Sequence, residues 1–270
     1  MPVIPGCTWI QQNTLVINKA IDNAKSINAS LVLDKFVPWN SLDFSSMSEP
    51  KPGKKRHFEK VIRVSATNSL LNNSNYDQLK QRRYILNNIV TFSLTTKTRL
   101  IVNHGGESIL DNSIALHPYF GFPLIPATAI KGVTRHYCDE YLKLFKENKE
   151  MYLRIFGNKP GHKDAREGEI IFFDAWPSSL GSYLELDIFT PHYQRYYKGN
   201  DPPRDNQNPV PILFLAVKKG VSFEFAIATS SNYKGNDINQ FLEQVKNYIG
   251  DALKTFGIGA KTGSNYGYFE

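Results

Sequence analysis

Small polar side chains are interleaved with glycines near the C-terminus, and these residue types suit phosphate binding. Residues 257–268 read GIGAKTGSNYGY, in which one lysine lies among four glycines. Glycine permits positive φ angles and close backbone approach, so bare N–H groups can surround an anion. The predicted phosphate contacts are Gly257, Gly259, Lys261, Thr262, Gly263 and Gly267. A glycine-rich loop that only closes a helix has the same composition, and the residue types leave both interpretations open.

This loop fits neither of the familiar nucleotide motifs. Ala260 precedes the lysine where a Walker A loop has glycine, and a predicted helix rather than a strand precedes the loop. The same order of elements excludes a dinucleotide fingerprint. We therefore expect no nucleotide cofactor.

A second pair of cations lies in the first turns of another predicted helix. The stretch IPATAIKGVTRHY places Lys131 and Arg135 four residues apart, hence on one helix face. Free N–H groups and the helix dipole favour an anion there, which predicts phosphate contact. Gly132 costs about 1 kcal/mol relative to alanine in a helix, and a backbone running close by would explain it. Two solvated cations and a packing glycine are the structural alternative.

Two further stretches are basic, and one of them is also aromatic. Residues 37–57 are rich in proline and serine and are expected to form a loop or arm with a basic end. Residues 190–211 interleave tyrosines with cations, as in proteins that stack on unpaired bases, although packing of a long loop explains them equally well. The predicted contacts with RNA or another subunit are Lys54, Lys55, Arg56, His192, Tyr193 and Arg195.

Catalytic and metal-binding signals are weak. The six histidines have no metal-ligand spacing, and two cysteines are too few for a disulfide framework or a thiolate zinc site. His104, beside Gly105 and Gly106, is the strongest candidate acid or base, but a lone loop histidine usually has no catalytic role. We expect no metal, no cofactor and no catalytic residue.

Composition narrows the class of protein. The 270 residues carry 32 lysines and arginines against 25 acids, a net charge of +7, which allows a polyanionic partner. No apolar run is long enough to cross a membrane, and no secretory signal is visible. We expect a soluble cytoplasmic protein.

Hydrophobic patterning predicts the elements that would position these residues. Helical periodicity falls at 10–33, 76–86, 127–145 and 237–256. Strand patterns fall at 88–102, 169–175, 184–189, 212–217 and 221–228, the last two as a hairpin turning at 218–220. Asp237 is expected to cap the last helix, and Gly257 to follow it as a C′ glycine.

The order of these elements predicts an α+β fold. It matches a ferredoxin-like, RNA-recognition-type β-α-β-β-α-β core with large insertions. Residues 1–87 are expected to form a helical and loop extension packed on a core of residues 88–270.

Four segments together resemble the RAMP superfamily of CRISPR-associated proteins. They are PATAIKGVTR, GEIIFFDAWP, PHYQRYY with NPVPILFLAVKKGVSFEF, and FGIGAKTGSNYGYF. The resemblance covers roughly residues 91–270 and is most specific to a subunit of the type III-B (Cmr) effector complex. It implies a ferredoxin-like RNA-binding core, with Lys131, Gly132 and Arg135 matching the helix-start signature and the glycine loop matching that of the superfamily.

The resemblance also implies a function. We expect a non-catalytic subunit that binds guide RNA near its 3′ end, meets target RNA and other RAMP subunits, and serves antiviral defence. The alternative is a metal-independent endoribonuclease that processes guide RNA, with His104 as its acid or base. A scaffold that contacts partner subunits and no RNA is a third interpretation.

Overall fold

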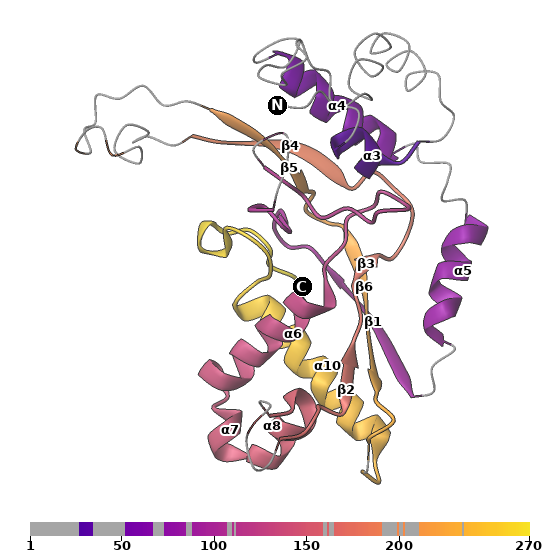
Figure 1. Ribbon diagram of the computed structural model, residues 1–270, viewed down its shortest axis with the longest axis vertical. Helices are drawn as coiled ribbons and strands as arrows, with labels where there is room; N and C mark the ends of the chain where they lie inside the picture. The colour runs from indigo at the N-terminus through magenta and orange to yellow at the C-terminus, as the bar shows by residue number, and fades with distance from the viewer. Residues whose placement is uncertain are drawn as a thin grey trace.

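The computed structural model describes residues 27–34, 52–66, 73–84, 88–106, 112–158, 165–190, 211–233 and 235–270, with single positions 110, 161, 199 and 202. These residues form an α+β arrangement of two antiparallel sheets and the helices packed on them (Figure 1).

The main sheet is built around strand β6 (Ser222–Thr229). It pairs antiparallel with β1 (Ile89–Thr95) on one side, and with β2 (Ile170–Phe172) and β3 (Trp176–Pro177) on the other. A single bridge between Thr96 and Phe269 brings the C-terminal residues beside the end of β1. The sheet therefore gathers segments from both ends of residues 88–270.

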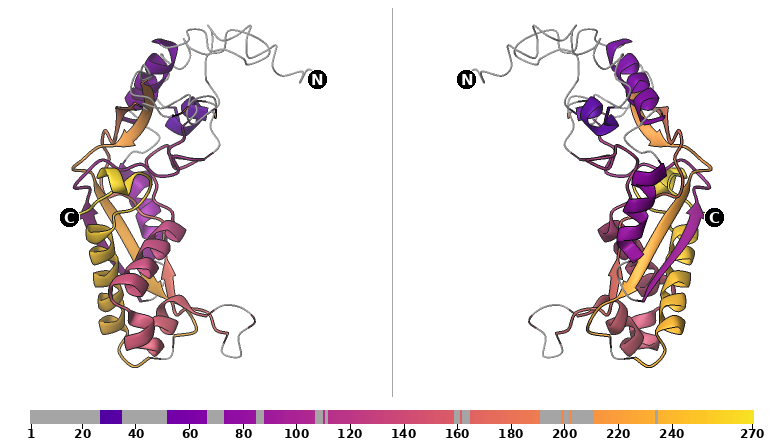
Figure 2. Two further views of the ribbon diagram at one scale, coloured as in Figure 1. Left: turned by 90° about the vertical axis from the view of Figure 1, so that its left-hand side faces the viewer. Right: turned by 90° about the vertical axis from the view of Figure 1, so that its right-hand side faces the viewer.

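Helices cover both faces of this sheet. On one face lie α6 (Ala127–His136) and α10 (Ile238–Thr255), which pack on each other. Alternate residues of β6 point into the core, whereas Glu224 faces α5 (Asn73–Tyr84) on the other side. Figure 2 shows α5 and α10 on opposite sides of β6.

The second sheet is a two-stranded ribbon at one end of the molecule. Strand β4 (Leu184–Phe189) pairs with β5 (Ile212–Val217), and a bridge between Leu100 and Val217 ties the ribbon to the segment after β1. Helix α4 (Pro52–Ala66) packs on the ribbon and on α3 (Ala29–Asp34) (Figure 1).

The prediction that strands 212–217 and 221–228 form a hairpin turning at 218–220 is wrong. Strands β5 and β6 do follow each other, but β5 pairs with β4 while β6 pairs with the main sheet. The turn instead carries the chain between two sheets, and it is held by the buried Thr96, whose hydroxyl donates to the carbonyl of Lys218 and accepts from the N–H of Val221. A tertiary contact, which local sequence does not encode, decides the pairing.

The single helix predicted at 127–145 is broken. Helix α6 passes into a π-helical turn, η1 (Tyr137–Tyr141), and Lys143 has a left-handed φ of 51°. Two short helices follow, α7 (Leu144–Glu147) and α8 (Lys149–Phe156), and the second was not predicted. Asn148 caps α8 by accepting the N–H of Met151, which gives the break a local cause.

Other boundaries differ in smaller ways. The strand predicted at 88–102 ends at Thr95, and the segment predicted as a loop at 37–57 is helical from Pro52 onward, while 37–51 lie outside the described residues. Of the helix predicted at 10–33, only its end is described, as α3. Asp237 caps α10 and accepts the N–H of Gln240, and Gly257 follows with a φ of 68°, both as predicted.

Candidate nucleic-acid interface

The glycines of residues 257–268 are required by contacts inside the protein. A Cβ at Gly267 would overlap the carbonyl oxygen of Ile258, and a Cβ at Gly259 would overlap that of Ile101. Both glycines have positive φ, 78° and 91°, in which side chains are strained. Gly263 has neither restriction. Its φ is not positive, and a Cβ there would meet nothing within 4 Å.

Backbone N–H groups of the loop also donate within the protein. Ala260 N donates to Ile101 O at 2.8 Å, and Gly267 N donates to Arg99 O at 2.7 Å. Further internal donors are the N–H groups of Ile258, Ser264, Asn265 and Tyr266. These six N–H groups are not available to a phosphate, which leaves side chains and other N–H groups, among them those of residues 261–263, as the loop's means of binding an anion.

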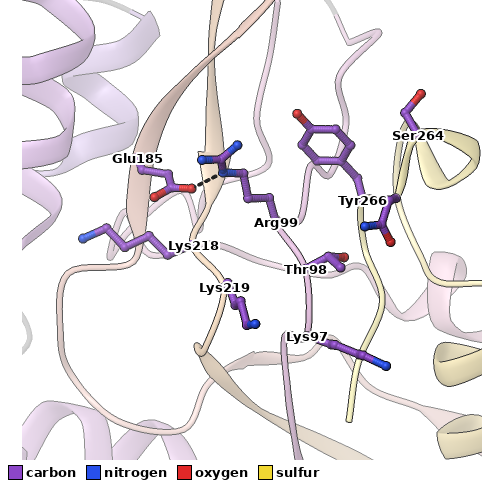
Figure 3. Close-up of a pocket in the computed structure, with 9 residues that line it drawn as sticks. Lys97, Thr98, Arg99, Glu185, Lys218, Lys219, Ser264 and Tyr266 are labelled. Carbon is purple, nitrogen blue, oxygen red and sulfur yellow. Dashed lines mark hydrogen bonds and ion pairs between the residues drawn. The ribbon is translucent and has the colours of Figure 1, made fainter.

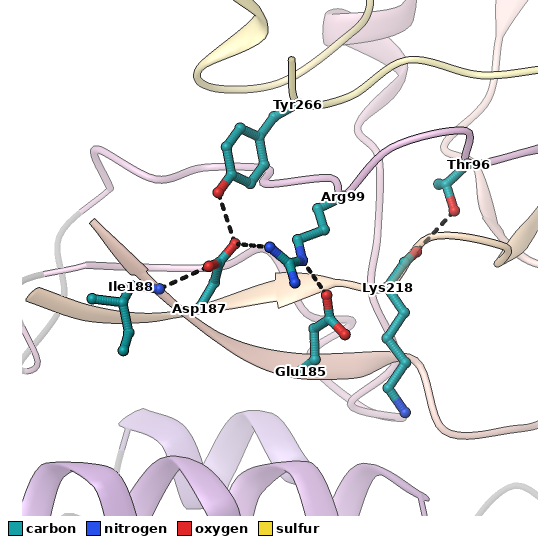
Figure 4. A network of polar contacts seen from close by, with 7 residues as sticks. All are labelled: Thr96, Arg99, Glu185, Asp187, Ile188, Lys218 and Tyr266. Atoms are coloured by element: carbon teal, nitrogen blue, oxygen red, sulfur yellow. Dashed lines mark hydrogen bonds and ion pairs between the residues drawn. The ribbon is translucent and has the colours of Figure 1, made fainter. Parts of the chain in front are cut away.

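Side chains tie the loop to strand β4. Tyr266 Oη donates to Asp187 Oδ2 at 2.7 Å, and the same oxygen accepts from Arg99 Nη1 at 3.1 Å (Figure 4). Arg99 Nε donates to Glu185, two residues before Asp187 on the strand. Burial, followed by the hydrogen bond to Asp187, raises the pKa of Tyr266, so its hydroxyl remains a donor at neutral pH.

A basic groove lies beside this network. Its larger part has a volume of about 630 Å³, and Figure 3 shows its walls. The lining residues are Lys97, Thr98, Arg99, Glu185, Lys218, Lys219, Ser264, Asn265 and Tyr266. An adjoining hollow of about 530 Å³ shares Lys97 and Lys219 and adds Lys254 and Tyr268, together with Phe269 and one acidic residue, Glu270.

The lysines of the groove are not neutralised. Among the described residues, no carboxylate lies within ion-pair distance of Lys97, Lys219 or Lys254, and Lys218 donates to the hydroxyl of Ser182 at 2.8 Å. Cations without acidic partners that line a hollow give a positive potential suited to a polyanion. Together with two tyrosines on its wall, this groove has the features of a nucleic-acid interface.

Lys261 lies on the ribbon side of the loop. Its Nζ is 4.2 Å from the centroid of the Phe189 ring, and its own φ is 59°. His104 packs edge-on against Phe189 and Phe214, with ring centroids 6.1 and 5.4 Å away. Burial, and then the charge of Lys261, lower the pKa of His104, so it is neutral at physiological pH.

On α6, Arg135 is directed toward α8 rather than toward the glycine loop. Arg135 donates to the hydroxyl of Tyr152 at 2.8 Å and lies 3.9 Å from Asp139, so its side chain faces α8. Within the described part of the chain, no recorded contact joins Lys131 or Arg135 to residues 257–268. The backbone expected near Gly132 is not there, because a Cβ at that position meets nothing within 4 Å.

The remaining predicted contacts divide into two groups. Lys54, Lys55 and Arg56 lie on α4, where Lys54 is 5.7 Å from the Phe58 ring centroid and Lys55 pairs with Glu59 at 3.8 Å. His192, Tyr193 and Arg195 lie outside the described residues.

Sequence reasoning missed the principal cations of the groove. Lys218 and Lys219 fall in the turn predicted at 218–220. Lys97 falls in the strand predicted at 88–102 and Lys254 in the helix predicted at 237–256, and none of the four is among the predicted contacts. The dipeptide Lys218–Lys219 directly before Gly220 was the available signal. Neither a group of residues able to hold a metal ion nor a helix apolar and long enough to span a membrane occurs in the described part of the chain.

Comparison with known proteins assigns this α+β chain to a family. The chain belongs to the RAMP superfamily, whose family model matches residues 93–270. It is similar to Cmr6 of the CRISPR system Cmr complex from Pyrococcus furiosus, with 32% identity over 66% of this chain and 66% of that protein. It is also 32% identical to Cmr6 from Saccharolobus solfataricus over 72% of this chain and 62% of that one.

A solved structure is similar in fold to nearly all of this chain. A chain in the cryo-EM structure of the type III-B Cmr-β complex bound to cognate target RNA aligns with 99% of this chain and 89% of its own length, with a TM-score of 0.58 and 23% identity. This comparison shows a shared fold. The chain spans slightly less than two thirds of the length of the two curated relatives it matches.

Proposed function

We propose that this chain is a non-catalytic guide-RNA-binding and assembly subunit of a type III-B CRISPR interference complex. It lies near the 3′ end of the guide, in the cytoplasm, and acts in antiviral defence with other RAMP subunits and target RNA as partners. The similarity to Cmr6 subunits supports the proposal that the chain is a subunit of this complex. The observation that carries RNA binding is the groove of unpaired lysines beside the glycine loop.

The arrangement of the groove favours recognition of a phosphate backbone. Its lysines come from three segments that the fold brings together: the end of β1, the turn before β6 and the last turn of α10. Lysine ammonium groups are mobile point charges without base-reading geometry, whereas phosphate contacts position a strand independently of sequence. Binding is therefore largely independent of the guide sequence.

We further propose that the core is ferredoxin-like. The strand order β1-β6-β2, with Phe269 bridging Thr96 outside β1, matches a β-α-β-β-α-β unit whose last strand is a single bridge. In this proposal residues 88–270 are the RNA-binding core and residues 1–87 an extension. The contacts of α4 with the ribbon and of α5 with Glu224 support packing of that extension on the core.

The predicted phosphate contacts outside the groove remain part of the proposal. Lys131 and Arg135 on α6 and Lys261 in the loop would each supply a cation to the same RNA at separate points along it. A purified Lys131→Ala, Lys261→Ala variant should bind single-stranded RNA more weakly and with a shallower dependence on salt. Unchanged affinity and an unchanged salt slope would exclude these two lysines.

The groove has its own test, which decides whether the chain binds RNA there. Lys97→Ala with Lys219→Ala removes two unpaired cations, and the slope of log affinity against log salt should become less negative by about 1.4, since each phosphate contact on a single strand contributes about 0.7. Lys246→Ala, a lysine of α10 that pairs with Glu243 and lines neither hollow, is the control. A slope that stays the same in the groove variant would contradict the proposed function.

The second candidate function is endoribonuclease activity. Burial and then the charge of Lys261 lower the pKa of His104, so its imidazole is neutral at physiological pH, the form in which a general base accepts a proton. Its ring also packs against two phenylalanines, as a structural histidine does. Incubation of the protein with repeat RNA in EDTA separates the two: specific cleavage that His104→Ala abolishes would establish the enzyme. A pure scaffold would bind partner subunits and neither bind nor cut RNA.

A further inference from the structure

We propose that Arg99 is a positioning residue that shields the RNA groove from two carboxylates and contacts no phosphate itself. This inference rests on the proposed binding of RNA along the lysines of the groove. It gives Arg99 a function opposite to the one its place on the groove wall suggests, because a groove arginine is ordinarily counted as a phosphate ligand.

Arg99 donates to carboxylates from two of its three guanidinium nitrogens, Nε and Nη1, and its side chain is 48% exposed. Nε donates to Glu185, and Nη1 donates to Asp187 at 3.1 Å, so the guanidinium bridges two carboxylates of one strand face. Residues two apart on a strand point to the same side, and the fork of an arginine matches that spacing as a lysine ammonium cannot. In Figures 3 and 4 the guanidinium is turned toward β4.

The two carboxylates are held by more than Arg99. Asp187 also accepts from Tyr266 Oη at 2.7 Å and from the N–H of Ile188 at 2.8 Å, and its side chain is 12% exposed. Within the described part of the chain, Glu185 pairs with Arg99 alone; its side chain is 31% exposed and lines the groove. Removal of Arg99 would leave Glu185 free to turn toward the groove while Asp187 stayed charged beneath it.

The electrostatic consequence is larger than the loss of one charge. Four cations, Lys97, Arg99, Lys218 and Lys219, line the larger hollow with one carboxylate, Glu185. Without Arg99, that carboxylate repels phosphate directly and becomes an ion-pair partner for Lys218 or Lys219, which lowers the positive potential that attracts RNA. The pairing with Arg99 therefore keeps the lysines available.

The experiment compares Arg99→Met in two backgrounds of the full chain. One is the natural sequence and the other carries Glu185→Gln with Asp187→Asn, which keeps both hydrogen-bond acceptors and removes both charges. Affinity for a labelled oligouridylate is measured across a salt series. We expect a loss of about tenfold in the natural background and a several-fold smaller loss in the neutralised one, because Arg99 is there one more groove cation with no carboxylate to shield.

Lys97→Met is measured in the same two backgrounds as the matched control, since an unpaired groove lysine should lose the same affinity in both. An equal loss for Arg99→Met in both backgrounds would make Arg99 a phosphate ligand and overturn the inference alone. If Lys97→Met and Arg99→Met both leave affinity unchanged, RNA does not use the groove, and the proposed function and the inference are overturned together.

Folding is monitored in each variant by thermal unfolding. Where Arg99→Met does not fold, Arg99→Lys takes its place in both backgrounds. Lysine keeps the charge but cannot bridge both carboxylates, so it should lose affinity only in the natural background. The same loss in both would again overturn the shielding function.

Discussion

The hydroxyl of Tyr266 donates to Asp187 Oδ2 at 2.7 Å and so joins the glycine loop to strand β4. The two residues are 79 positions apart in the chain. Arg99 meets the same carboxylate oxygen, which makes Asp187 the point where three segments converge. The position of the loop relative to the groove therefore depends on one side-chain network as well as on the backbone contacts of the glycines.

Loss of the Tyr266 hydroxyl should loosen this connection. Tyr266→Phe keeps the ring beside Phe214 but removes the donor, and we expect the free energy of unfolding to fall by about 1 kcal/mol, the usual net value of a hydrogen bond. Equilibrium denaturation measures this change. Tyr268→Phe, which loses a longer 3.3 Å bond to the carbonyl of Thr262, is the control and should change stability less. An equal effect of the two substitutions would show that the bond to Asp187 has no special weight.

The glycines of the loop should differ sharply in their tolerance of alanine. At Gly267 an added Cβ meets the Ile258 carbonyl and φ is 78°, so Gly267→Ala should destabilise the protein by at least about 1–2 kcal/mol, the cost of a left-handed side chain alone. Gly263→Ala meets nothing within 4 Å and should stay within about 0.5 kcal/mol of the parent. Thermal and denaturant unfolding of the pair provide the measurement, and a similar loss at both positions would contradict the loop geometry.

Helix α5 should depend on a buried ion pair. Arg83, 5% exposed in its side chain, lies 3.5 Å from Glu224 on β6 and stacks on the Trp176 ring at 3.1 Å. Arg83→Met leaves Glu224 buried with only Lys80 as a partner, and a loss of about 3–5 kcal/mol is expected when one member of such a pair is removed. Adding Glu224→Gln should restore part of that loss. If the double variant is less stable than the single one, the carboxylate is not the cause.

Stability should fall as the solution is acidified below the ordinary histidine pKa of about 6.5. Burial lowers the pKa of His57, His104 and His117 in the folded protein. Below about 6.5 the unfolded chain therefore binds more protons than the folded one, so the free energy of unfolding decreases there and is constant with respect to these groups at higher pH.

His117 offers a direct test of this pH dependence. Its Nδ1 accepts the N–H groups of Tyr119 and Phe120 at 3.2 and 3.3 Å, which a proton on that nitrogen would disrupt. Denaturant unfolding across a pH series should show a smaller decrease below about 6.5 for a His57→Gln, His117→Gln variant than for the parent. A decrease of the same size in both would assign the effect to other groups.

Several features were predictable from the sequence because their causes are local. Asp237 caps α10 and Gly257 ends it through contacts within a few residues, so helix-boundary patterns sufficed. The strands predicted at 184–189 and 212–217 have the same bounds in the structure, because short apolar runs of this length favour strands. The family assignment was also confirmed, since it depended on residue order over much of the chain.

Only the tertiary structure decided the partners of these elements. Adjacent strands β5 and β6 go to different sheets because Thr96, more than 120 positions away, holds their turn. Lys97, Lys219 and Lys254 are far apart in sequence, and no local pattern could group them, whereas Arg135, four residues after Lys131, is directed toward α8. The sequence alone determined the last helix, most of the strands and the family that the chain resembles. The tertiary structure decided which cations share a groove, because long-range packing and ion pairing, absent from local patterns, set those distances.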